Sequence, residues 1–97
     1  LLVDDMIDTG GTIVQGAQAL VDAGAKQIFA CCTHAVLSGP AIERIEKSPI
    51  EELVMLDTIL LPEEKHIPKI KILSTADIFA AAIENVYLDK PMSKIYD

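Results

Sequence analysis

A short apolar run ends in two acidic residues within the opening stretch Leu1-Leu2-Val3-Asp4-Asp5-Met6-Ile7-Asp8-Thr9-Gly10-Gly11-Thr12. An amphipathic pattern of helical period follows, so the stretch predicts a strand, a loop of small residues and a helix. Ligands of open α/β sheets bind outside the carboxyl ends of the strands. The sequence therefore predicts an α/β domain with a polar site where this first strand ends.

The loop and the acidic residues suit different parts of one ligand. Gly10 and Gly11 have no Cβ, so the backbone can approach a ligand closely. Free N–H groups in the loop and at the helix start attract an anion such as phosphate. Asp4 and Asp5 instead accept hydrogen bonds from a vicinal diol, or coordinate a hard cation such as Mg2+. A diol beside a phosphate describes ribose 5-phosphate.

A purely structural interpretation also accounts for these residues. Asp4 and Asp5 then simply end a strand, and either Asp8 or Thr9 caps the helix that follows. Spacing alone does not choose between the two interpretations.

Residues 3–12 resemble the phosphoribosyl-diphosphate-binding motif of type I phosphoribosyltransferases and ribose-phosphate diphosphokinases. The resemblance implies a three-layer α/β fold with a mostly parallel sheet, of which this chain is a partial domain. It also implies that Asp4 and Asp5 contact the ribose hydroxyls, with Mg2+ as a further ligand of both. The 5-phosphate would be held by Asp8, Thr9, Gly10, Gly11 and Thr12.

A second segment, residues 30–45, resembles bacterial ribose-phosphate diphosphokinases more narrowly. The resemblance implies an enzyme that moves the diphosphate of Mg-ATP onto the anomeric hydroxyl of ribose 5-phosphate, and that assembles as a homohexamer. Residues 1–97 would be the C-terminal part of its second phosphoribosyltransferase-like domain, with no catalytic residue of their own. Two alternatives stay open, a base-specific type I phosphoribosyltransferase and a catalytically silent regulatory homologue.

Composition restricts the partners of the chain. A net charge of −7 over 97 residues argues against nucleic acid and against an anionic membrane surface. No apolar run approaches the roughly 18 residues that a membrane span needs. Arg44 is the only arginine, so we expect the nucleotide-handling half of the site to lie outside this chain. The adjacent Cys31 and Cys32 suit two free thiols in a reducing cytoplasm.

The remaining strands place further polar residues at the same edge. The continuous apolar run at 27–32 predicts a strand buried on both faces, and it ends at Thr33 and His34. His34 is either a catalytic base or ligand contact, or a structural strand-end residue. Asp57 and Thr58 follow the third predicted strand and are peripheral candidates. Alternation over residues 69–73 predicts an edge strand.

The last helix begins at a capping sequence. Ser74 is predicted as its N-cap, with Asp77 three residues later in the manner of a capping box. The family resemblance also makes Ser74 and Thr75 possible contacts of an allosteric nucleotide. The helix carries the apolar residues Ile78, Phe79, Ala82, Ile83 and Val86. The family resemblance implies that the tail from residue 92 ends in a short strand.

Overall fold

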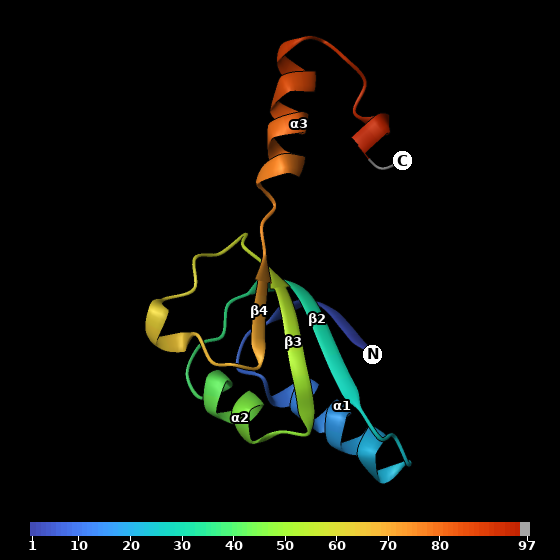
Figure 1. Cartoon of the computed structure of the whole chain (residues 1–97), viewed down its shortest axis with the longest axis vertical. Coiled ribbons are helices and arrows are strands. Elements are labelled where there is room, and N and C mark those ends of the chain that lie inside the picture. The colour runs from blue at the N-terminus through green and yellow to red at the C-terminus, as the bar shows by residue number, and fades with distance from the viewer. Residues whose placement is uncertain (96–97) are drawn as a thin grey trace.

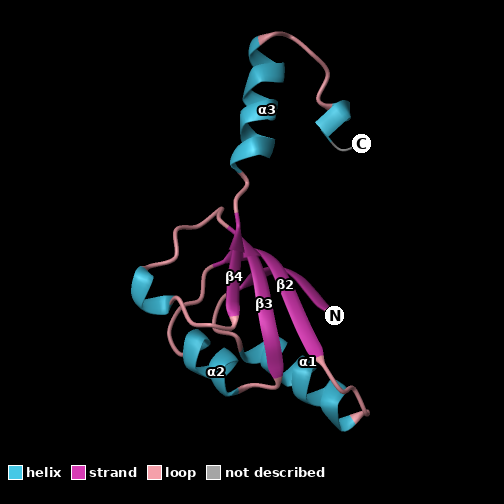
Figure 2. Cartoon of the chain, viewed as in Figure 1, coloured by secondary structure: helices cyan, strands magenta, loops and turns pink. Residues whose placement is uncertain are grey.

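The computed structural model describes residues 1–95 of the chain. Strands and helices alternate along it, as the sequence predicts (Figures 1 and 2). The elements in chain order are β1 (Leu2–Ile7), α1 (Gly11–Asp22), β2 (Ile28–Ala35), α2 (Ala41–Lys47), β3 (Ile50–Leu56), the 3-10 turn η1 (Glu63–Lys65), β4 (Ile70–Leu73), α3 (Ala76–Tyr87) and the 3-10 turn η2 (Ser93–Ile95).

The strands form one parallel sheet in the order β1-β2-β3-β4. Asp4 pairs with Cys32, and Met6 pairs with His34, across the first two strands. The carboxyl ends of the strands gather at one edge of the sheet, which Figure 2 shows beside the start of α3. The predicted α/β class and parallel sheet are confirmed, and β4 is an edge strand as predicted.

Helices α1 and α2 cover one face of the sheet. They contact each other, and α1 packs against β1 and β2. Burial alternates along β2, where Ile28 and Ala30 are buried while Phe29 is 40% exposed. The prediction that this strand is buried on both faces is therefore wrong within residues 1–95, because α1 and α2 bury their side chains in the same core. That core contains Ile7, Ile13, Ala17, Ile28, Ala30, Cys32, Ala35, Leu37, Ala41, Ile45, Ile50, Leu53, Met55, Leu61 and Ile70.

The opposite side of the sheet, here called the outer sheet face, carries apolar side chains that stay accessible. Val3, Cys31 and Val54 are register partners across β1, β2 and β3. Val3 is 72% exposed, and Leu73 on β4 is 55% exposed. The described residues thus form two layers, helices and sheet, with the second sheet face open, as expected of a partial domain.

Helix α3 extends away from the sheet (Figure 1). No residue of α3 is buried in the structure, and the apolar Ile83 and Val86 are each 69% exposed. The tail folds as η2 where a strand was expected, and its last residues lie outside the described part. Within residues 1–95, every helix is too short or too polar to cross a lipid bilayer.

Candidate functional site

A cavity of about 230 Å3 lies at the carboxyl end of β1, where the chain turns into α1. We call it the β1 cavity. It combines a carboxylate wall with a backbone wall, as the opening motif predicts. Its lining residues are Asp4, Met6, Ile7, Asp8, Thr9, Gly10, Thr12 and Ile13.

The two leading acidic residues are placed differently. Asp4 lines the β1 cavity, whereas Asp5 does not, because consecutive side chains on a strand point to opposite faces. The Asp5 backbone N–H donates to Asp4 Oδ1 over 2.8 Å, which fixes one oxygen of the Asp4 carboxylate. The second oxygen of Asp4 is left for a ligand. The structure therefore brings Asp4, and not Asp5, to the wall of the cavity.

Gly10 makes the tight turn into the helix. It is the N-cap of α1 and has a φ of +82°, a conformation that side-chain-bearing residues rarely adopt. A Cβ at this position would lie 3.4 Å from Ala41 Cα, so the turn is also packed tightly against α2. No side chain caps the helix, which contradicts the prediction that Asp8 or Thr9 does so. The first N–H groups of α1 are therefore available to an anion in the cavity.

Two side chains from the following β–α unit hold the loop in place. The Ser38 hydroxyl donates to Asp8 Oδ1, and the Ser38 N–H donates to Asp8 O over 2.9 Å. Arg44 Nη1 donates to Thr9 O over 3.1 Å. Neither contact was predicted, because both partners lie far from the loop in the sequence. The Asp8 carboxylate and its carbonyl oxygen thus join the two loops.

Mg2+ is compatible with this arrangement only together with a substrate. Residues 1–95 contain no group of three or more His, Cys, Asp or Glu side chains placed to hold a metal ion. Mg2+ is commonly bound by one or two carboxylates, with water and substrate oxygens completing the shell. Asp4 fits that pattern, whereas the Asp5 side chain points to the opposite face of β1.

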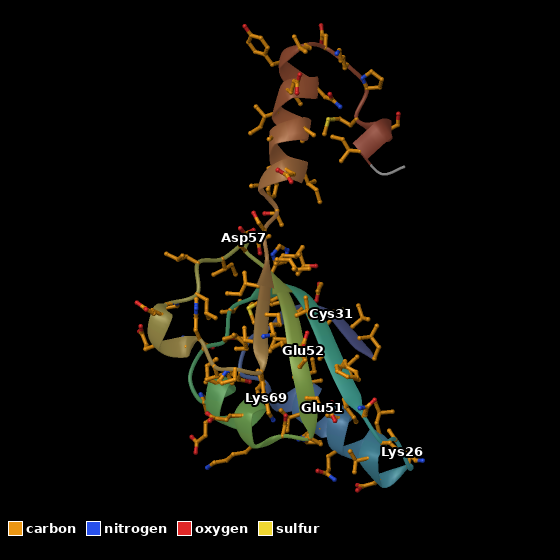
Figure 3. The ribbon with its side chains drawn as sticks, viewed as in Figure 1. Lys26, Cys31, Glu51, Glu52, Asp57 and Lys69 are labelled. Atoms are coloured by element: carbon orange, nitrogen blue, oxygen red, sulfur yellow. The ribbon has the colours of Figure 1, made fainter. Side chains whose placement is uncertain are left out.

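Further along the carboxyl edge, polar residues bond to one another. His34 Nδ1 lies 2.8 Å from Thr58 Oγ1, so these two candidates are joined across β2 and β3. Asp57 lies at the foot of α3 (Figure 3), where its Oδ1 accepts from Thr75 N–H over 2.8 Å and from Thr75 Oγ1 over 2.6 Å. These bonds lower the pKa of the Asp57 carboxyl.

Ser74 and Thr75 both have structural partners at this position. Ser74 Oγ accepts from Ala76 N–H over 3.1 Å, but the N-cap of α3 is Thr75, so the predicted cap is displaced by one residue. Thr75 is buried and bound to Asp57. Both lie beyond the lining of the β1 cavity, and an allosteric role for them stays a prediction.

The whole chain, residues 1–97, matches the model of a family described as the phosphoribosyl synthetase-associated domain. The chain belongs to this family. A ribose-phosphate pyrophosphokinase of Clostridium acetobutylicum is 62% identical over 96 residues, which cover 99% of this chain and 30% of that protein. One from Bacillus caldolyticus is 56% identical over 97 residues, covering 100% of this chain and 31% of that protein.

A solved relative has the same fold. The crystal structure of phosphoribosylpyrophosphate synthetase from Mycobacterium smegmatis superposes with a TM-score of 0.89 and 39% sequence identity, over 91% of this chain and 30% of that one. The resemblance to ribose-phosphate diphosphokinases is thereby confirmed. The family member described here spans about 30% of the length of the relatives that it matches.

Proposed function

We propose that these residues form the ribose 5-phosphate site of a ribose-phosphate diphosphokinase. The intact enzyme would transfer the diphosphate of Mg-ATP to the C1 hydroxyl of ribose 5-phosphate, giving phosphoribosyl diphosphate and AMP. The observation that carries the proposal is the β1 cavity, which joins the Asp4 carboxylate to an uncapped helix start in one space. A sugar phosphate offers matching groups, hydroxyl donors at one end and an anion at the other.

Each wall of the cavity takes one end of the ligand. Asp4 accepts hydrogen bonds from the ribose hydroxyls, and Asp5 supports it through the backbone N–H that donates to Asp4 Oδ1. The 5-phosphate lies on the backbone of Thr9, Gly10, Gly11 and Thr12, where the helix dipole favours negative charge. Asp8 contributes its main chain, since its carboxylate is bound to Ser38.

The reaction is an attack of the sugar hydroxyl on the β-phosphorus, and it depends on positioning and charge neutralisation. Mg2+ would supply charge neutralisation for the phosphoryl oxygens when bound beside Asp4. Arg44 is engaged with the loop backbone, so it does not supply a cation to the nucleotide. We place the nucleotide-handling residues outside these 97 residues, which would be the C-terminal part of the second domain of a cytoplasmic homohexamer.

The proposal is tested by replacing Asp4 with Ala in the intact enzyme. Hydrogen bonds to a charged group are worth about 1.5–3 kcal/mol, so use of ribose 5-phosphate should weaken by tens-fold or more. Asp5→Ala should weaken it less, because Asp5 lies off the cavity wall. Asp22→Ala is the matched control, since Asp22 lies at the far end of α1 and bonds only to Gln18 among the described residues. Steady-state kinetics with ribose 5-phosphate and Mg-ATP give the readout, and unchanged kinetics for Asp4→Ala would refute the assignment.

A further inference from the structure

A chain of three polar groups crosses the carboxyl edge next to the β1 cavity. His34 Nδ1 lies 2.8 Å from Thr58 Oγ1, and Thr58 Oγ1 donates to the carbonyl oxygen of Thr33 over 3.1 Å. His34 is exposed, and Thr33 and Thr58 are half-buried. The cavity residues described above do not include any of the three.

The two hydrogen bonds that join these polar groups determine the tautomer of His34. A hydroxyl group has one hydrogen to donate, and a carbonyl oxygen can only accept. Since Thr58 gives its hydrogen to Thr33 O, its oxygen must accept from His34 Nδ1–H. The neutral imidazole therefore carries its proton on Nδ1, and Nε2 is a hydrogen-bond acceptor.

The accepting nitrogen belongs to a residue directly beside the cavity. His34 is the register partner of Met6, a cavity residue, and therefore lies on the same face of the sheet. The chain after His34 is attached to the cavity loop, because Leu37 N–H donates to Ile7 O over 3.0 Å. Within residues 1–95, no hydrogen bond reaches His34 Nε2.

We infer that His34 is an additional ligand-contacting residue of the sugar-phosphate site. Its Nε2 accepts a hydrogen bond from a hydroxyl of the bound sugar, and Thr58 is the positioning residue that keeps the ring in the accepting tautomer. The inference rests on the proposed function for the identity of the ligand. It adds to the acidic wall a neutral acceptor, contributed by the neighbouring strand.

Two amide substitutions separate this role from a structural one. The side-chain nitrogen of Asn occupies nearly the position of Nδ1, so His34→Asn keeps the bond to Thr58 and removes the ligand contact. The longer amide of Gln reaches the position of Nε2, so His34→Gln keeps an acceptor for the ligand and loses Thr58. Titration calorimetry on the intact protein measures the affinity for ribose 5-phosphate. His34→Asn should bind it about threefold to tenfold more weakly than the wild type, and the affinity of His34→Gln should stay within about twofold of the wild type.

A second ligand and a second site complete the test. Inorganic phosphate lacks the sugar hydroxyls, so its affinity should be the same in the wild type and in His34→Asn. Thr58→Val should weaken ribose 5-phosphate binding, and Thr58→Ser should restore it. Nitrogen NMR of the wild-type ring should show the proton on Nδ1, and Thr58→Val should shift the population toward Nε2–H.

The results that overturn the inference are distinct from failure of the proposed function. Equal losses in the two His34 variants, or a larger loss in His34→Gln, would make the residue structural only. A wild-type ring protonated on Nε2 would also refute it. If Asp4→Ala weakens ribose 5-phosphate binding while His34→Asn does not, the inference alone fails. If the wild type does not bind ribose 5-phosphate, the proposed function fails and the inference with it.

Discussion

Helices α1 and α3 have the same length and similar amphipathic sequences, yet they end in opposite environments. Helix α1 lies on the sheet and buries Ile13 and Ala17, whereas α3 extends from the sheet edge and buries none of its residues (Figure 1). The difference comes from the connections. A strand follows α1 and returns the chain to the sheet, while α3 follows the edge strand β4 and is directed by the bonds between Asp57 and Thr75.

The comparison shows that periodicity identifies the apolar side of a helix but not what covers it. The solved relative from Mycobacterium smegmatis superposes on 91% of the chain, and the remaining 9% is shorter than α3 with its tail. Part of α3 or of the tail that follows it is therefore included in that superposition. The exposed stripe of α3 and the outer sheet face are the two apolar surfaces that the described residues leave uncovered.

The largest expected effect distinguishes the two helices directly. Ile13→Ala removes a buried side chain and should lower the free energy of unfolding of the chain by about 2–5 kcal/mol. Ile83→Ala is the matched substitution on α3, where the side chain is 69% exposed, and it should change the stability by no more than about 0.5 kcal/mol. Urea denaturation followed by circular dichroism measures both. A comparable loss in Ile83→Ala would mean that α3 packs on something within these 97 residues.

The two faces of the sheet allow a second comparison of a covered position with an accessible one. Cys32 lies under the helices, and burial raises the pKa of its thiol to about 11. At pH 8 only about one Cys32 in a thousand would be thiolate, so iodoacetamide should leave it unmodified in the folded chain. Cys31 lies on the outer sheet face and should be alkylated. Single Cys→Ser variants and mass spectrometry assign the two rates, and equal rates would contradict the one-sided covering of the sheet.

The smallest expected effect concerns the hydrogen bonds between Asp57 and Thr75 at the start of α3. The hydrogen bonds from Thr75 lower the pKa of the Asp57 carboxyl below its ordinary value of about 3.9. A lowered folded-state pKa contributes stability above the unfolded pKa, and that contribution is lost as the pH falls through the folded value. As the pH falls below about 5, the free energy of unfolding of the wild type should therefore decrease more than that of Asp57→Asn, because only the wild type has this carboxyl to protonate. Parallel thermal-melt curves for the two proteins across this range would disprove a role of the ionised carboxylate.

Most of the strands and helices that pack together could be predicted from the sequence. A strand, a glycine loop and an amphipathic helix were predicted around residues 3–23, and all were found, because their signals are local. The first glycine of the loop was confirmed as the turn into the helix by its positive φ. The difference between the two sheet faces was not predictable, because a continuous apolar run looks the same whether one face or both are covered, and within residues 1–95 the helices cover one face only.

The cavity residues were predicted from the sequence, but the side chains that hold their loop in place were not. The residues that line the β1 cavity come from one continuous segment, residues 4–13, and the motif contains all of them except Ile13. Ser38 and Arg44 reach that segment from 30 and 35 residues away. Such contacts depend on how α2 is set against α1, and no local pattern encodes that. The separation of Asp4 from Asp5 was predictable from strand alternation, because consecutive side chains on a strand point to opposite faces.

The order of the strands in the sheet is their order in the chain, which has a consequence for biosynthesis. Each strand pairs with the strand made just before it, so each pairing closes one strand–connection–strand loop and none spans the whole chain. During translation, which adds roughly 5–20 residues per second, β1, α1, β2 and α2 are made before α3. The strand pairing beside the β1 cavity therefore does not wait for α3.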